Sequence, residues 1–283
     1  MGSGPGSMLC PNCRKLVSVA AEKCPHCGAK RPGLYGLGPG LSRLFGGRID
    51  AVALITPVCI VLYVIGLLLD PRAAFRSPSI FRLLSPGGQA LDLLGATSPW
   101  DLVNGHWWTV LTAIYLHGGL LHIAFNLMWV RQLAPEVERA FGSARFFVIW
   151  TVAGGVGFLA SAGLPILGIG RAHGSIGASG AIFGLLAALI VYGRTVGASM
   201  MTRQIWQWAI ILAVFGFVVP GVDNFAHLGG FAGGWIAAKA LGSGRSTGEG
   251  RGTVLLATAL LGLTLFGFGA QLLQVLSALT GHH

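Results

Sequence analysis

The chain of 283 residues is strongly apolar, since 53% of its residues are hydrophobic and only 10% are charged, and its mean hydropathy is +0.71. A soluble domain carries about 25% charged residues, so this composition excludes an ordinary soluble protein. The formal net charge of +10 could indicate nucleic-acid binding, but the basic residues are spread over many loops rather than gathered in one patch. We therefore predict an integral membrane protein and expect no nucleic-acid partner.

The N-terminal segment carries two C-x-x-C pairs, Cys10 with Cys13 and Cys24 with Cys27, separated by ten residues. Two such pairs can place four thiolates around a tetrahedral zinc ion, and a reducing cytosol disfavours the competing disulfides. A redox dithiol would need only one of the pairs. We predict a cytoplasmic zinc ribbon over residues 10–28, in which the metal supplies the folding free energy that so short a module lacks.

Glycine-rich stretches flank this module on both sides. We expect residues 1–9 to form a flexible tail and residues 29–50 to form a linker. The ribbon could recruit a cytosolic protein partner, sense metal or only stabilise the N-terminus, and the sequence leaves these three roles open.

Seven apolar segments follow, each long enough to cross a membrane as a full or shortened helix. They occupy residues 51–69, 119–134, 146–163, 176–193, 205–220, 225–241 and 254–275. The first is too long for a cleaved signal peptide and is expected to remain as a signal anchor. We predict an all-α polytopic membrane protein with a six-helix core over residues 51–241. Residues 242–283 would then form a cytoplasmic loop, a seventh helix and a tail.

The basic residues set the predicted orientation, because cytoplasmic loops are enriched in Lys and Arg. One side of the predicted topology holds 15 of the 19 Lys and Arg residues, including all seven that precede the first segment. The opposite side holds Arg72, Arg76, Arg82 and Arg171. We therefore expect a cytoplasmic N-terminus, in a plasma membrane.

Three polar motifs lie within the first two turns of the second, fourth and sixth segments. They are His122–Asn126 (HIAFN), Gly177–Gly180 (GASG) and Ala226–Gly230 (AHLGG). Polar groups are costly in a bilayer and mark function there. Since the three helices would run in the same direction, His122, Ser179 and His227 would share a depth of about 5 to 10 Å below the outer surface. A serine and a histidine that can meet inside a membrane indicate a protease.

Glycines on the fourth and sixth segments form three G-x-x-x-G patterns, which allow helix backbones to touch. The pairs are Gly180 with Gly184, Gly229 with Gly233, and Gly230 with Gly234. Tight packing of these helices would bring Ser179 to His227. Generic helix packing would explain the glycines alone, but not the buried serine and histidine.

The motifs together resemble the rhomboid family of intramembrane serine proteases. The resemblance covers about residues 100–240 and adds Gly105–Thr109 (GHWWT), Glu138 and Arg139 to the three motifs. It implies single-span membrane proteins as substrates, cut in or near the membrane after a small residue, by a site that opens to the outside.

The resemblance also implies residue roles. Ser179 would be the nucleophile and His227 the general base, as a dyad that needs no cofactor. His122 and Asn126 would stabilise the oxyanion together with the Ser179 backbone N–H. In serine proteases each such donor is worth about 3 to 4 kcal/mol. Asn126 can always donate, whereas His122 donates only from a protonated ring nitrogen.

Other residues near the motifs have supporting roles in this interpretation. Phe183 could stack on the His227 ring, and Gly177 and Gly229 are expected to contribute to packing or substrate contact. Asp223 precedes His227 by four residues and could complete a triad. We favour instead a cap for the sixth helix.

One departure from the family is Thr109, which stands where an arginine usually follows Trp108 and braces the preceding loop. We also expect residues 70–104 to fold partly into the membrane surface, and His117 to be structural.

Two rival functions remain. A catalytically silent relative would bind or escort membrane proteins, and a transporter would also bury polar groups.

Overall fold

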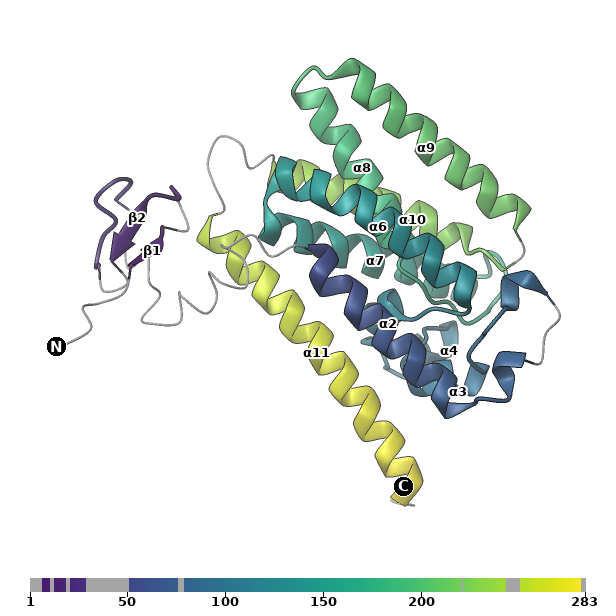
Figure 1. The fold of residues 1–283 in the computed structure, drawn as a ribbon. Coiled ribbons are helices and arrows are strands. Elements are labelled where there is room, and N and C mark those ends of the chain that lie inside the picture. The colour runs from purple at the N-terminus through teal and green to yellow at the C-terminus, as the bar shows by residue number, and fades with distance from the viewer. Residues whose placement is uncertain are drawn as a thin grey trace.

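A computed structural model of the chain describes residues 7–10, 13–18, 21–28, 51–75, 79–219, 221–242 and 250–280. These residues are mostly helical, and the strands among them form a single small hairpin (Figure 1). The predicted linker, residues 29–50, lies outside the described residues. The fold is thus the all-α polytopic bundle that the sequence predicts.

The N-terminal hairpin pairs β1 (Ser7–Leu9) with β2 (Leu16–Ser18) in antiparallel register, with Leu9 opposite Leu16. The structure differs here from the predicted tail, since residues 7–9 are a strand rather than part of a flexible segment. The reason is that the turn around the first cysteine pair brings this segment beside β2. The Cys10 N–H donates to the Lys15 carbonyl over 2.9 Å and continues the pairing.

A helix lies at each of the seven predicted segments. They are α2 (Ala51–Leu69), α6 (Leu120–Phe141), α7 (Ser143–Ile166), α8 (Ser179–Thr195), α9 (Ser199–Val218), α10 (Asn224–Leu241) and α11 (Arg251–Thr280). The helix α6 extends well beyond its predicted end, because it continues through Pro135. Proline costs a helix one hydrogen bond but keeps a helical φ. The extension lets Glu138 Oε2 accept from the Ala51 N–H over 3.3 Å, which ties α6 to α2.

Shorter helices connect the long ones. They are η2 (Ala73–Phe75), η3 (Ile80–Arg82), α3 (Gly88–Leu93), α4 (Pro99–Val103), α5 (Thr109–Thr112) and η4 (Ala113–Tyr115). Most of them belong to the segment that we expected at the membrane surface. Its exposed Phe75, Trp100 and Val103 side chains are apolar, as that location requires.

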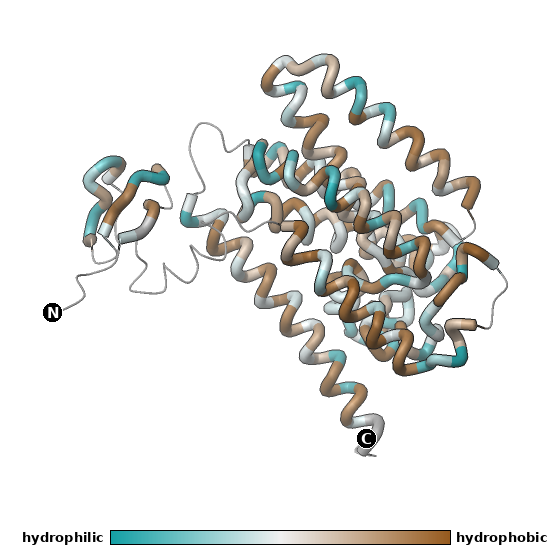
Figure 2. Tube along the Cα trace, viewed as in Figure 1, coloured by the Kyte–Doolittle hydropathy of each residue, from teal (hydrophilic) through white to brown (hydrophobic). Residues whose placement is uncertain are grey.

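Four of the described helices, α2, α7, α9 and α11, are long and apolar enough to cross a membrane. A fifth crossing follows if α5, η4 and α6, bent by 91°, act as one broken span. The helix α8 is shorter, and the glycines and histidine of α10 lower its hydropathy. The chain therefore has several membrane-spanning helices, whereas the number of seven crossings stays a prediction. Apolar residues dominate α2, α9 and α11 along their lengths (Figure 2).

The centre of the bundle consists of α7, α8 and α10, with α6 and α9 beside them (Figure 1). The α7 residues Trp150 and Ala153 are fully buried, as are Leu185 and Ile190 of α8. A helix that is apolar on every face is typical of a bundle interior. Because α6, α8 and α10 alternate with α7 and α9, their N-terminal ends meet on one side, where the polar motifs lie.

Candidate active site

The helix α8 begins at Ser179, directly after a turn that requires glycine. Gly177 has a φ of +124°, which L side chains rarely adopt. Its N–H donates to the Ala113 carbonyl over 2.9 Å. Since Ser179 is the first residue of the helix, its backbone N–H has no acceptor within α8. The loop thus presents both a half-buried hydroxyl and a free N–H donor at one residue.

His227 lies in the first turn of α10, opposite Ser179. Its Nε2 is 2.9 Å from Ser179 Oγ, which is hydrogen-bond distance. The ring stacks on Phe183, with centroids 4.3 Å apart and planes inclined by 22°. Within the described part of the chain, His227 Nδ1 has no hydrogen-bond partner. The stacked ring is held by packing, and its one polar contact is the serine.

Glycines allow the close approach of α8 and α10. A Cβ on Gly230 would overlap the carbonyl oxygen of Gly180, and a Cβ on Gly234 would overlap the backbone of Gly184. The other pattern on α10 serves a different helix, because a Cβ on Gly229 would lie 2.8 Å from the Ala160 side chain of α7. The sequence predicted a tight interface between α8 and α10 only. In the structure, one glycine face of α10 packs on α8 and the other packs on α7.

The two polar motif residues near the start of α6, His122 and Asn126, lie on one face, one turn apart. Asn126 Nδ2 donates to the His122 carbonyl over 2.8 Å. His122 Nδ1 accepts from the Gly118 N–H over 3.2 Å, so a neutral ring carries its proton on Nε2. That nitrogen faces the Ser179 loop, since a Cβ on Gly177 would lie 2.7 Å from it. His122 therefore presents a donor toward the loop that carries the serine.

His117 lies beside this pair. Its side chain is fully buried, and its ring centroid is 5.1 Å from that of His122. The contact is edge-on, with the planes inclined by 65°. His117 thus limits the position of the His122 ring, which agrees with the structural role expected of it.

Asp223 caps α10 rather than contacting the His227 ring. Its Oδ1 accepts from the Ala226 N–H over 3.0 Å, and its Oδ2 accepts from the hydroxyls of Ser161 and Ser175. The predicted cap is confirmed. Sequence reasoning missed the two serines, because they are 62 and 48 residues away along the chain and carry no local signal.

The central part of the chain is similar to known proteins. The family model described as the rhomboid domain matches residues 104–244. YdcA of Bacillus subtilis, a rhomboid-family protein, is 30% identical over 138 residues, which are 48% of this chain and 67% of YdcA. This chain belongs to the rhomboid family. The rhomboid protease GluP of Bacillus subtilis is 36% identical over 190 residues, and RHOMBOID-like protein 4 of Arabidopsis thaliana is 32% identical over 170.

The coverage of these rhomboid relatives is partial. The matches span 65% and 58% of this chain, but only 36% of GluP and 42% of RHOMBOID-like protein 4. The matched domain contains all three polar motifs. The cysteine pairs, α2 and α11 lie outside it.

The helix α11 contacts the loop that leads into α5, where Thr109 stands in place of the arginine that is usual in rhomboids. Trp108 Nε1 donates to Gln271 Oε1 over 3.3 Å, and Gln271 Nε2 donates to the Asp92 carbonyl over 2.8 Å. Thr109, in place of the arginine, donates its buried hydroxyl to the His106 carbonyl over 2.8 Å. The loop is therefore held by a C-terminal helix outside the matched domain.

The four cysteines ahead of the rhomboid domain form one cluster. The sulfur atoms of Cys10, Cys13, Cys24 and Cys27 all lie within 4.8 Å of one another. The Cys10–Cys27 and Cys13–Cys24 sulfur distances are 3.8 and 3.7 Å, well beyond the disulfide bond length of about 2.05 Å. The cluster could bind a metal ion.

Proposed function

We propose that this rhomboid-family protein is an intramembrane serine endopeptidase that acts through Ser179 and His227. The observation that carries the proposal is the 2.9 Å contact between Ser179 Oγ and His227 Nε2. As Oγ attacks a peptide carbonyl, Nε2 would take its proton and later return it to the leaving amine. The unpartnered Nδ1 and the cap role of Asp223 favour a dyad over a triad.

The oxyanion would be stabilised by three donors. These are His122 Nε2–H, the second Nδ2 hydrogen of Asn126 and the Ser179 backbone N–H. The bond from Gly118 fixes the tautomer that His122 needs, and the bond to the His122 carbonyl fixes Asn126. Donors that are already oriented cost no reorganisation as charge develops.

The substrates would be single-span membrane proteins, cut in or near the membrane after a small residue. The helix of such a substrate must unwind locally, because a hydrogen-bonded helix hides its carbonyls from attack. Ser179 lies at the N-terminal ends of the central helices, and water must reach it from that side. The distribution of Lys and Arg supports an outward-facing site, a cytoplasmic N-terminus and a plasma-membrane location.

We propose the predicted six-helix core, residues 51–241, as the catalytic unit, followed by the α11 region. The test is cleavage of a fluorogenic transmembrane peptide by detergent-purified protein, with a fluorophosphonate probe as the second measurement. Ser179→Ala should abolish both cleavage and labelling, and His227→Ala should abolish cleavage. Ser199→Ala, at an exposed serine that begins α9, is the matched control and should behave as wild type.

The alternative is a catalytically silent relative that binds or escorts membrane proteins. A folded wild-type protein that neither labels nor cuts a panel of transmembrane peptides would favour this alternative. Cleavage that persists in Ser179→Ala would show that the assigned nucleophile is wrong.

We also propose that the cysteine cluster is a structural zinc ribbon on the cytoplasmic side. A tetrahedral ion with Zn–S bonds of about 2.3 Å places its sulfurs about 3.8 Å apart. The 3.8 and 3.7 Å pairs fit that geometry. Elemental analysis should give one zinc per chain, lost in Cys10→Ser/Cys24→Ser but kept in Cys59→Ala, at a buried cysteine of α2. Retention of zinc in the double variant would contradict the proposal. A cytosolic protein partner of the ribbon is tested by pull-down, with the same double variant as control.

A further inference from the structure

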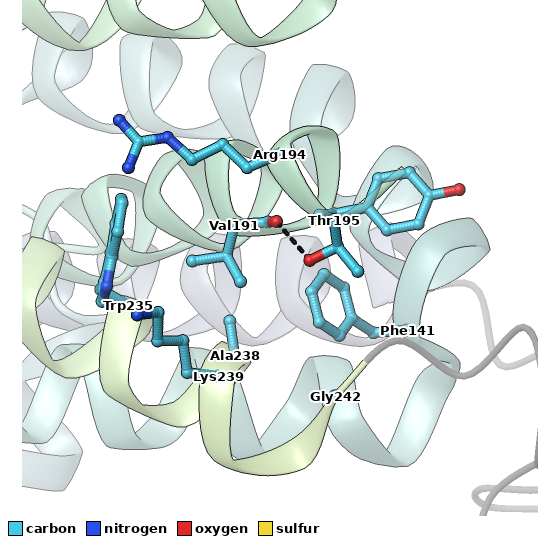
Figure 3. Close-up of a pocket in the computed structure, with 9 residues that line it drawn as sticks. Phe141, Val191, Arg194, Thr195, Trp235, Ala238, Lys239 and Gly242 are labelled. Carbon is cyan, nitrogen blue, oxygen red and sulfur yellow. Dashed lines mark hydrogen bonds between the residues drawn. The ribbon is translucent and has the colours of Figure 1, made fainter. Parts of the chain in front are cut away.

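A cavity of about 480 Å³ lies at the opposite end of the bundle from Ser179. It is a half-open pocket lined by the C-terminal ends of α6, α8 and α10 (Figure 3). The dyad lies at the N-terminal ends of α8 and α10, so this cavity is a separate site. Nothing in the proposed proteolysis uses it.

Two cations flank one aromatic ring at the edge of this cavity. Arg194 Cζ is 5.2 Å and Lys239 Nζ is 5.9 Å from the centre of the Trp235 ring. Figure 3 shows the three side chains together on one side of the cavity. The ion pairs found among the described residues join Arg139 to Glu136 and His106 to Asp101, so neither cation here has a carboxylate partner in that part of the chain.

The helix ends compensate only part of this positive charge. A helix C-terminus carries about half a negative charge, so α8 and α10 together offset about one of the two cations. The end of α6 is already met by Arg145, whose Nη1 donates to the Phe141 carbonyl over 3.1 Å. Among the residues that the structure describes, a net charge of about +1 is left at the pocket, which favours an anion there.

Much of the rest of the pocket wall is apolar, and Tyr192 and Thr195 add one hydroxyl each. Phe141, Val191 and Ala238 are buried and line the pocket, with Val191 and Ala238 beside the two cations and Phe141 on the far side (Figure 3). The Thr195 hydroxyl is turned to its own helix, donating to the Val191 carbonyl over 2.9 Å. A cationic edge beside an apolar wall suits an amphiphile, because a free inorganic anion would leave the apolar wall exposed to water.

The location of the cavity points to the same ligand. It lies at the ends of helices that cross or line the membrane bundle, beside Trp235 and Trp206, and Arg194 Cζ is also 6.0 Å from the Trp206 ring. Tryptophans concentrate at the level of lipid headgroups. On the same helix end, Ile236 is 65% exposed, as a lipid-facing residue would be. We infer that this pocket binds the phosphate headgroup of an anionic phospholipid, with Arg194 and Lys239 supplying the positive charge.

The test is native mass spectrometry of the full chain in a non-ionic detergent. The protein is titrated separately with dioctanoyl phosphatidylglycerol, dioctanoyl phosphatidylcholine and inorganic phosphate. Wild type should retain one phosphatidylglycerol more tightly than the other two probes. Arg194→Gln/Lys239→Gln should weaken that binding about tenfold or more, since each basic residue near an anionic headgroup contributes to affinity.

Two control variants complete the design. Arg203→Gln removes an exposed arginine of α9 that lies outside the pocket and has no ion-pair partner among the described residues, and it should leave binding unchanged. Arg194→Lys/Lys239→Arg keeps both charges and should retain most of the affinity. If the neutral double variant does not fold, the two single Gln variants are used, each with an expected loss of several-fold.

Three results would overturn the inference. They are unchanged binding in the neutral variants, an equal loss in Arg203→Gln, and equal binding of phosphatidylcholine. Inorganic phosphate that binds as tightly as phosphatidylglycerol would overturn the lipid assignment and identify a soluble phosphate as the ligand.

Discussion

The backbone N–H of Gly118 donates to Nδ1 of His122 over 3.2 Å. This one bond decides which nitrogen of a neutral His122 carries the proton, and so turns the ring into a donor toward the Ser179 loop. Gly118 lies four residues before His122, at the start of the bend between η4 and α6. The bend between η4 and α6 therefore sets the tautomer of His122.

We expect His122→Ala to lower kcat about 10²- to 10³-fold, because it would remove one of the proposed oxyanion donors. Labelling of Ser179 by the fluorophosphonate should still be detectable, since the serine and His227 remain. His173→Ala, at an exposed loop histidine, is the control. A His122→Ala enzyme with wild-type kcat would exclude His122 from the oxyanion site.

Gly230→Ala should destabilise the bundle by about 1 to 3 kcal/mol or more and abolish activity. The added methyl would overlap the Gly180 carbonyl and push α10 away from α8. Thermal unfolding in detergent measures the first effect and peptide cleavage the second. Gly262→Ala on α11 meets nothing within 4 Å and should change neither. Equal effects of both substitutions would argue against the glycine interface.

Substitutions of Asp223 separate a helix cap from a triad acid. Asp223→Asn keeps an oxygen that can accept from the Ala226 N–H and should retain most activity, whereas a triad acid would lose about 10⁴-fold in kcat. Asp223→Ala should lower stability by about 0.5 to 2 kcal/mol, and by more if the hydroxyls of Ser161 and Ser175 stay unpaired. Paired measurements of kcat and unfolding temperature distinguish the two roles. A 10⁴-fold loss in Asp223→Asn would restore the triad.

Gln271→Leu should loosen the segment that precedes α5. It leaves the Trp108 indole N–H and the Asp92 carbonyl without their partner on α11, at a cost of about 1 to 3 kcal/mol where these groups are buried. The unfolding temperature should fall while Ser179 labelling persists. Thr258→Val, which removes a bond within α11 only, is the control. An unchanged unfolding temperature would mean that α11 does not brace the loop.

Much of the fold followed from local pattern. Each apolar segment is a helix, because long apolar runs leave the backbone no partner in a membrane except itself. The predicted limits of the segments were less accurate, since α6 continues through Pro135 and residues 7–9 pair with β2. Both differences depend on contacts with distant residues, which a local pattern does not contain.

The sequence by itself determined the membrane character, the seven helical segments and the family, because each rests on composition or on motifs a few residues long. The same motifs singled out Ser179, His227, His122 and Asn126 as the candidate site residues. Only the tertiary structure decided which atoms meet. It joined Ser161 and Ser175 to Asp223, Gln271 to Trp108, and Arg194 to the Trp235 ring. The physical reason is that hydrogen bonds, ring contacts and cavities act over a few ångströms in space, whereas these groups lie tens of residues apart along the chain.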